Sequence, residues 1–89
     1  MVQVKEKGQG EFLVIISEGG KRTEHIVRID DSYYRYLTEN QMSREELVEA
    51  SFAFLLQREP AESILPEFDL RVINRYFPDY EREMQQMRR

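Results

Sequence analysis

Apolar and polar residues alternate in the first third of the chain in a way that predicts an antiparallel β-hairpin. Residues 12–16 form an apolar, mostly β-branched run, and residues 22–29 alternate between apolar and polar side chains. Gly19 and Gly20 lie between the two runs, and consecutive glycines favour a two-residue turn because both can adopt positive φ. The resulting register pairs Ile16 with Thr23, Val14 with His25, Phe12 with Val27 and Glu11 with Arg28.

A shorter alternation precedes the hairpin. Val2 and Val4 share one face of a potential strand, and Gly8 and Gly10 could turn this segment back onto residues 12–16. A two-stranded hairpin is only marginally stable by itself, so further strands or helices are expected against it. The sequence leaves open whether residues 2–4 add a third strand.

Two helices are predicted after the hairpin. Asp31 is suited to the N-cap of a short helix that ends near Glu39. Ser43 and Glu46 have the spacing of a capping box, which marks the start of a longer helix. This second helix is expected to reach residue 57 or 58, because Pro60 cannot continue it.

Prolines divide the last third of the chain into short segments. Pro60, Pro66 and Pro78 each interrupt a helical pattern. The segments predicted between them are a short turn over residues 61–65, a helix over 70–77 with Asp69 as its cap, and a helix over 80–87.

Residues 50–56 carry no charge, although they lie within the longest predicted helix. A helix that is apolar on nearly all sides is buried on more than one side. We therefore expect it in the core, against one face of the hairpin, rather than as an exposed docking surface. That face comprises Phe12, Val14, Ile16, Val27 and Ile29, whereas Leu13, Ile15 and Ile26 on the other face need cover from the C-terminal segment or from a second subunit.

Together these elements predict a single small α+β domain over residues 1–89. An N-terminal antiparallel β-hairpin, with the third strand left open, packs on a C-terminal helical region of three to five short helices. A chain of this length buries only about 60–65% of its unfolded surface, so its core is thin. Oligomerisation is one way in which such a domain gains stability.

The residue types argue against catalysis. The chain has no cysteine, and its single histidine, His25, lies mid-strand on the apolar face, where a structural role is expected. Gly8 and Gly10 lack the third glycine of a phosphate-binding loop, and the paired acids suit helix N-termini. We therefore expect no catalytic residue, cofactor or metal site, and a protein that is not an enzyme.

The net charge of −4 disfavours a broad nucleic-acid surface, which is usually basic. Without a signal-peptide pattern or an apolar run of membrane-spanning length, we expect a cytoplasmic protein with no membrane partner. Aromatic residues interleaved with arginines instead suggest a surface for a protein partner or a homodimer; the other interpretation is that these rings complete the core. The candidate surface residues are Tyr33, Tyr34, Tyr36, Arg71, Arg75, Tyr76 and Tyr80.

Residues 24–58 contain a short alternating strand, a short helix and a longer helix that begins at Ser43-Arg44. This order resembles the ribbon-helix-helix fold of small dimeric transcriptional repressors and antitoxins. The resemblance implies a strand that pairs with its twin and reads the DNA major groove, here through Glu24, Ile26 and Arg28. The apolar run 12–16 departs from that pattern, because it should pair with the same strand within one chain.

The second half of the chain has a different resemblance. The runs Arg-Glu-Pro from Arg58, Glu-Ser-Ile-Leu from Glu62, Phe-Asp-Leu from Phe68 and Tyr-Phe-Pro-Asp-Tyr from Tyr76 are similar to those of short uncharacterised bacterial proteins. This resemblance implies a small stand-alone bacterial protein and assigns no function to any residue.

Overall fold

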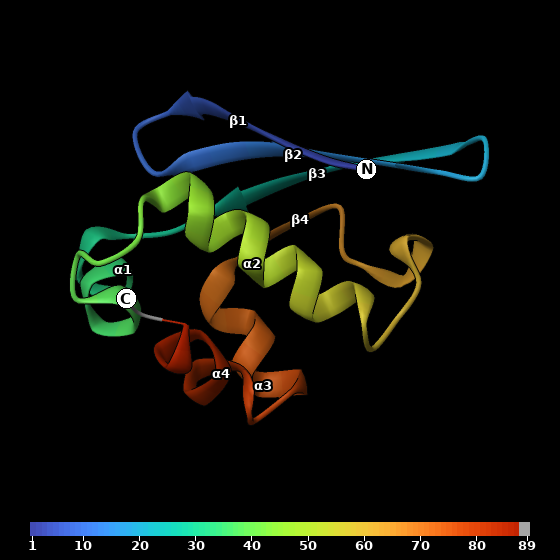
Figure 1. The fold of residues 1–89 in the computed structure, drawn as a ribbon. Coiled ribbons are helices and arrows are strands. Elements are labelled where there is room, and N and C mark those ends of the chain that lie inside the picture. Colours follow the sequence, from blue (N-terminus) through green and yellow to red (C-terminus); the bar gives the residue numbers. More distant parts are fainter. Residues whose placement is uncertain (88–89) are drawn as a thin grey trace.

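A four-stranded sheet forms one layer of the molecule, and the helices form the other (Figure 1). The computed structural model describes residues 1–87. The strands β1 (Val2–Gly8), β2 (Glu11–Glu18) and β3 (Lys21–Arg28) follow one another as an antiparallel meander. The short strand β4 (Glu67–Asp69) lies parallel to β3, so the strand order is β1-β2-β3-β4.

The helices lie together on one face of this sheet (Figure 1). Their arrangement confirms the predicted α+β class, with N-terminal strands packed on C-terminal helices. No helix within residues 1–87 is both long enough and apolar enough to cross a membrane. The helical elements are α1 (Asp31–Thr38), α2 (Arg44–Leu56), α3 (Ile73–Tyr76), α4 (Tyr80–Gln86) and the 3₁₀ turns η1 (Ala61–Ser63) and η2 (Leu70–Val72).

The hairpin has the predicted register, including the pairs Val14–His25 and Glu11–Arg28. β1 is the third strand that the sequence left open: it pairs with residues 11–16 of β2, with one irregularity between Glu6 and Gly8. Gly10 makes the turn between them possible: its φ is +73°, and a Cβ there would lie 2.8 Å from the Ile29 carbonyl oxygen. Its own carbonyl accepts a hydrogen bond of 2.9 Å from the Ile29 amide.

Helix α1 begins one residue earlier than predicted. Asp30, not Asp31, is the N-cap: its backbone is extended and its side chain accepts a hydrogen bond from the Tyr33 amide. Asp31 is the first helical residue, and its carboxylate pairs with Arg44. The capping box of Ser43 and Glu46 is confirmed, and α2 ends at Leu56, close to the predicted boundary.

Strand β4 was not predicted. Residues 67–69 place Phe68 opposite Val27, and the Ile26 amide donates a 2.8 Å hydrogen bond to the Pro66 carbonyl. Three residues are too few to show an alternating pattern, and the pairing partner is about forty residues away. This strand makes β3 an interior strand with neighbours on both sides.

The uncharged part of α2 is buried on two sides, as predicted. Phe52 faces the sheet, with its ring centre 5.6 Å from that of His25 and 6.0 Å from that of Phe68. Phe54 faces the C-terminal helices, 5.3 Å from the Tyr80 ring and 6.0 Å from the Phe77 ring. The predicted inner face of the sheet is also confirmed, since all five of its residues are buried: Phe12, Val14, Ile16, Val27 and Ile29.

The C-terminal segment does not cover the outer face of the sheet, contrary to one of the two expectations. Figure 1 shows the helices on the opposite face. Ile15 is nevertheless buried, and Leu13 and Ile26 are half-buried. Long polar residues lie opposite them on neighbouring strands, and such side chains can cover apolar surface with their methylene stems. These neighbours are Gln3, Lys5, Glu24 and Glu67.

Candidate functional site

An open groove of about 430 Å³ lies between the end of α2, the segment that leads through η1 into β4, and helix α3. Its walls are mainly aliphatic and aromatic side chains. We call it the α2–α3 groove, and its lining residues are Leu55, Glu59, Ser63, Ile64, Leu65, Phe68, Val72, Ile73, Tyr76 and Phe77.

Two large apolar side chains at this groove are exposed to solvent. Leu65 has 46% of its surface exposed and Tyr76 has 68%. Pro60 and Pro66 keep the segment between them out of regular helix, and α3 has only four residues. Neither wall is therefore long enough to cover the groove, although its floor residues Ile64, Phe68 and Ile73 are buried.

Among residues 1–87, Glu59 supplies the only carboxylate in the groove lining. Its side chain is half-buried, and within residues 1–87 its carboxylate has neither a hydrogen bond nor an ion pair. The neighbouring Arg58 is committed elsewhere: its Nη2 lies 2.9 Å from Asp79 Oδ2, and its guanidinium carbon lies 3.5 Å from the centre of the Phe54 ring. Arg58 therefore does not neutralise Glu59.

His25 fixes the segment that carries Leu65. Its Nδ1 lies 2.8 Å from the Leu65 carbonyl oxygen, and its Nε2 lies 3.0 Å from Thr23 Oγ1. A carbonyl oxygen can only accept, so Nδ1 carries the hydrogen and Nε2 can accept from the threonine hydroxyl. Both ring nitrogens are thus satisfied in a buried site, where the histidine positions the backbone of the groove wall.

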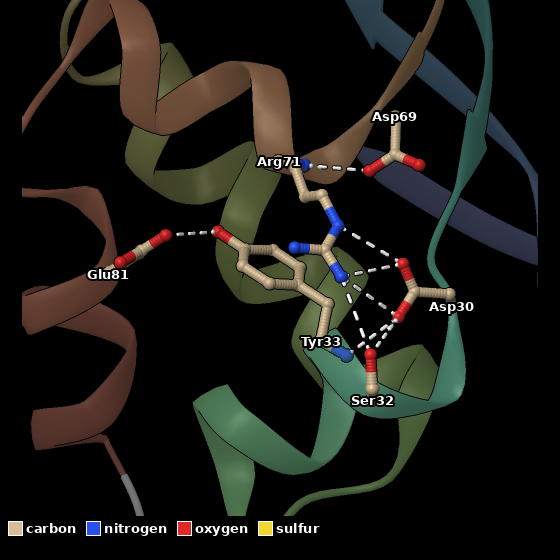
Figure 2. A network of polar contacts seen from close by, with 6 residues as sticks. All are labelled: Asp30, Ser32, Tyr33, Asp69, Arg71 and Glu81. Atoms are coloured by element: carbon tan, nitrogen blue, oxygen red, sulfur yellow. Dashed lines mark hydrogen bonds and ion pairs between the residues drawn. The ribbon is translucent and has the colours of Figure 1, made fainter.

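A second polar site lies at the N-terminus of α1, and Figure 2 shows it from close by. Arg71 Nε and Nη2 lie 3.1 and 2.9 Å from Asp30 Oδ2, and Asp30 Oδ1 accepts from Ser32 Oγ and from the Tyr33 amide at 2.8 Å each. Asp69 accepts from the Arg71 amide. These hydrogen bonds lower the pKa of Asp30 to about 2, with the largest effect from the Tyr33 amide and smaller ones from Ser32 and Arg71.

The tyrosine in this cluster links it to α4. The guanidinium carbon of Arg71 lies 4.5 Å from the Tyr33 ring centre, and the Tyr33 hydroxyl donates to Glu81 Oε2 at 2.9 Å. Burial, and next the hydrogen bond to Glu81, raise the pKa of Tyr33. We call Asp30, Ser32, Tyr33, Asp69, Arg71 and Glu81 the Asp30–Arg71 cluster; it ties α1, η2 and α4 together.

The structure divides the predicted interaction residues between the core and the surface. Tyr33, Tyr34 and Tyr80 are buried, and they contribute their rings to the core. The Tyr80 hydroxyl lies 2.6 Å from Ser51 Oγ, and burial raises the pKa of Tyr80. Tyr36, Arg71, Arg75 and Tyr76 are exposed. Arg71 belongs to the Asp30–Arg71 cluster and Tyr36 lies beside it, whereas Tyr76 lines the groove.

The DNA-binding alternative needs a strand with a free edge that pairs with a twin. In the structure the corresponding strand, β3, lies between β2 and β4. Glu24, Ile26 and Arg28 are on the outer face of β3, where β2 pairs along one edge and β4 pairs with Ile26–Arg28 on the other. A twin strand therefore finds no free edge at this end of β3. Arg28 also forms ion pairs with Glu67 and Glu11, so its guanidinium is already engaged.

Sequence reasoning missed Glu59, Leu65 and Val72 as parts of one surface. One signal was available: residues 59–70 contain four acidic side chains and no basic one, around an apolar Ile-Leu-Pro run. The cluster around Asp30 left no such signal, because its members are spread over more than fifty residues.

Within residues 1–87 no group of three or more histidine, cysteine, aspartate or glutamate side chains could hold a metal ion. Comparisons with protein families, with curated proteins and with solved structures found no match.

Proposed function

We propose that this protein is a non-enzymatic interaction module that binds a protein partner through the α2–α3 groove. One observation carries the proposal: Leu65 and Tyr76 expose large apolar surfaces beside a groove with a buried apolar floor. Exposed apolar patches on small domains commonly mark interaction sites, because covering them removes apolar area from water.

The Asp30–Arg71 cluster and the α2–α3 groove differ in the role that their composition suits. In the Asp30–Arg71 cluster the charged groups satisfy one another, which is what a structural tie requires. The groove offers apolar contact and one carboxylate. This composition suits recognition, whereas general acid–base chemistry needs a positioned group near the proton that it transfers.

The proposal can be tested with a variant that removes the exposed apolar groups without adding charge. In a pull-down from an extract of the cells that naturally contain this protein, the wild-type protein should retain a partner that Leu65→Ser/Tyr76→Ser does not retain. Tyr36→Ser is the matched control, because Tyr36 is also exposed (56%) but does not line the groove.

The captured partner would then be purified and its affinity measured by titration calorimetry. We expect the double variant to bind at least about tenfold more weakly, since truncated aromatic anchors commonly cost more than 1 kcal/mol. Equal affinities of the wild-type protein and the double variant would contradict the proposal.

A further inference from the structure

We infer that the occupant of the α2–α3 groove is a short segment of a partner protein in which a lysine or arginine lies next to a large apolar side chain. The apolar side chain would enter the groove, and the cationic group would pair with Glu59. This inference rests on the proposed function and specifies the chemistry of the partner.

The state of Glu59 is the first support. Glu59 is a half-buried residue in a lining that is otherwise mainly apolar, and its carboxylate has no partner within residues 1–87. A charge beside apolar walls interacts with an opposite charge more strongly than it would in open water, because the effective dielectric constant is lower. A bound cation would therefore gain more here than at an ordinary surface glutamate.

The neighbouring charges are the second support. Of the acids in residues 59–70, Glu62 pairs with Lys21, Glu67 pairs with Arg28, and Asp69 accepts from the Arg71 amide. Those carboxylates are engaged within the chain, which leaves Glu59 for a ligand. The unpaired charge of Glu59 also disfavours an acidic segment, and such repulsion adds selectivity.

The size of the groove favours a short segment over a second folded copy. A stable dimer buries about 800 Å² on each partner, which is about 15% of the 5374 Å² surface of this chain. Only three of the ten lining residues are exposed, namely Ser63, Leu65 and Tyr76. The groove can accommodate a few side chains, and a larger interface would need surface beyond it.

A selection from a random peptide library displayed on phage tests this inference directly. Peptides would be selected on the wild-type protein and then sorted by their dependence on the groove: retained by Tyr36→Ser but lost by Leu65→Ser/Tyr76→Ser. We expect the groove-dependent peptides to share a lysine or arginine within a few positions of a large apolar residue.

The charge pair itself is tested on synthetic copies of those peptides. Glu59→Gln should weaken their binding about three- to tenfold, between the typical effects of exposed ion pairs and of close ion pairs within interfaces. Glu49→Gln, which alters an exposed carboxylate of α2 outside the groove, should leave it unchanged. Replacing the basic residue of the peptide by glutamine should abolish the difference between the wild-type protein and Glu59→Gln.

The outcomes separate this inference from the proposed function. Groove-dependent peptides without a shared basic residue, or unaffected by Glu59→Gln, would overturn the inference and leave the groove as an interaction site. A selection without any groove-dependent peptide would count against both. A wild-type dimer in sedimentation that the double variant dissociates would identify a second copy as the occupant, and would also overturn the inference.

Discussion

The Asp30–Arg71 cluster and the α2–α3 groove share one short stretch of chain but differ in how their charges are satisfied. Asp69 and Arg71 belong to the cluster, whereas Phe68 and Val72 line the groove. The single carboxylate of the groove has no partner within residues 1–87, while Asp30 accepts hydrogen bonds from three groups. The mutually satisfied charges of the cluster stabilise the fold, whereas the groove leaves a surface available for binding.

This difference implies that substitutions in the two regions affect different properties of the protein. Changes in the cluster or beneath it should lower the free energy of unfolding. Changes at the rim of the groove should alter binding while the fold stays intact.

The largest effect is expected beneath both regions. Phe54→Asp places a charge where the ring now packs between Phe77, which lines the groove, and Tyr80, the first residue of α4, the helix that carries Glu81 of the cluster. An unpaired buried carboxylate costs several kcal/mol, so the domain should be unfolded at 25 °C by circular dichroism. Folded monomers derived from a wild-type dimer would instead show that Phe54 lies in a subunit interface.

A smaller loss is expected on removing the N-cap. Asp30→Ala deletes the acceptor of the Tyr33 amide and the partner of Arg71, and it should cost about 1–2 kcal/mol in urea unfolding. Asp31→Ala removes the adjacent carboxylate, which only pairs with Arg44, and should cost less than about 1 kcal/mol. Equal losses would mean that Asp30 does not have the distinct role assigned to it.

Acid should weaken the same region. The pKa of Asp30 is lowered to about 2 by the Tyr33 amide, Ser32 and Arg71, so the native state favours the ionised form. Its stabilising contribution is complete above the ordinary aspartate pKa near 4 and is lost as the pH falls toward 2. Asp30→Asn keeps a capping side chain but cannot titrate. Between pH 4 and pH 2 its Tm should therefore fall less than that of the wild-type protein.

The smallest effect on stability is expected at the rim of the groove. Leu65→Ser/Tyr76→Ser removes exposed groups, and the free energy of unfolding should change by no more than about 0.5 kcal/mol per site. The same variant should lose the partner. A loss of several kcal/mol in urea unfolding would show that these side chains belong to the core, and would end the contrast between the two regions.

Features that depend on neighbours in sequence were predictable. The glycine pair at 19–20 set the hairpin register, and Ser43 with Glu46 set the start of α2, because turns and caps are formed by residues a few positions apart. The choice between Asp30 and Asp31 was not predictable in this way. Either carboxylate can cap a helix, and the contact between Asp30 and Arg71 is visible only in the folded chain.

The sequence by itself determined the hairpin, the two main helices and the burial of residues 50–56, since these depend on local propensity and on the pattern of apolar residues. Only the tertiary structure decided that β4 completes the sheet beside β3 and that Tyr33 and Tyr80 are core residues while Tyr76 is exposed. It also decided that Glu59 lies in an apolar groove without a partner among residues 1–87. Three-residue pairings and long-range ion pairs carry no periodic signal, because their partners meet only after the chain has folded.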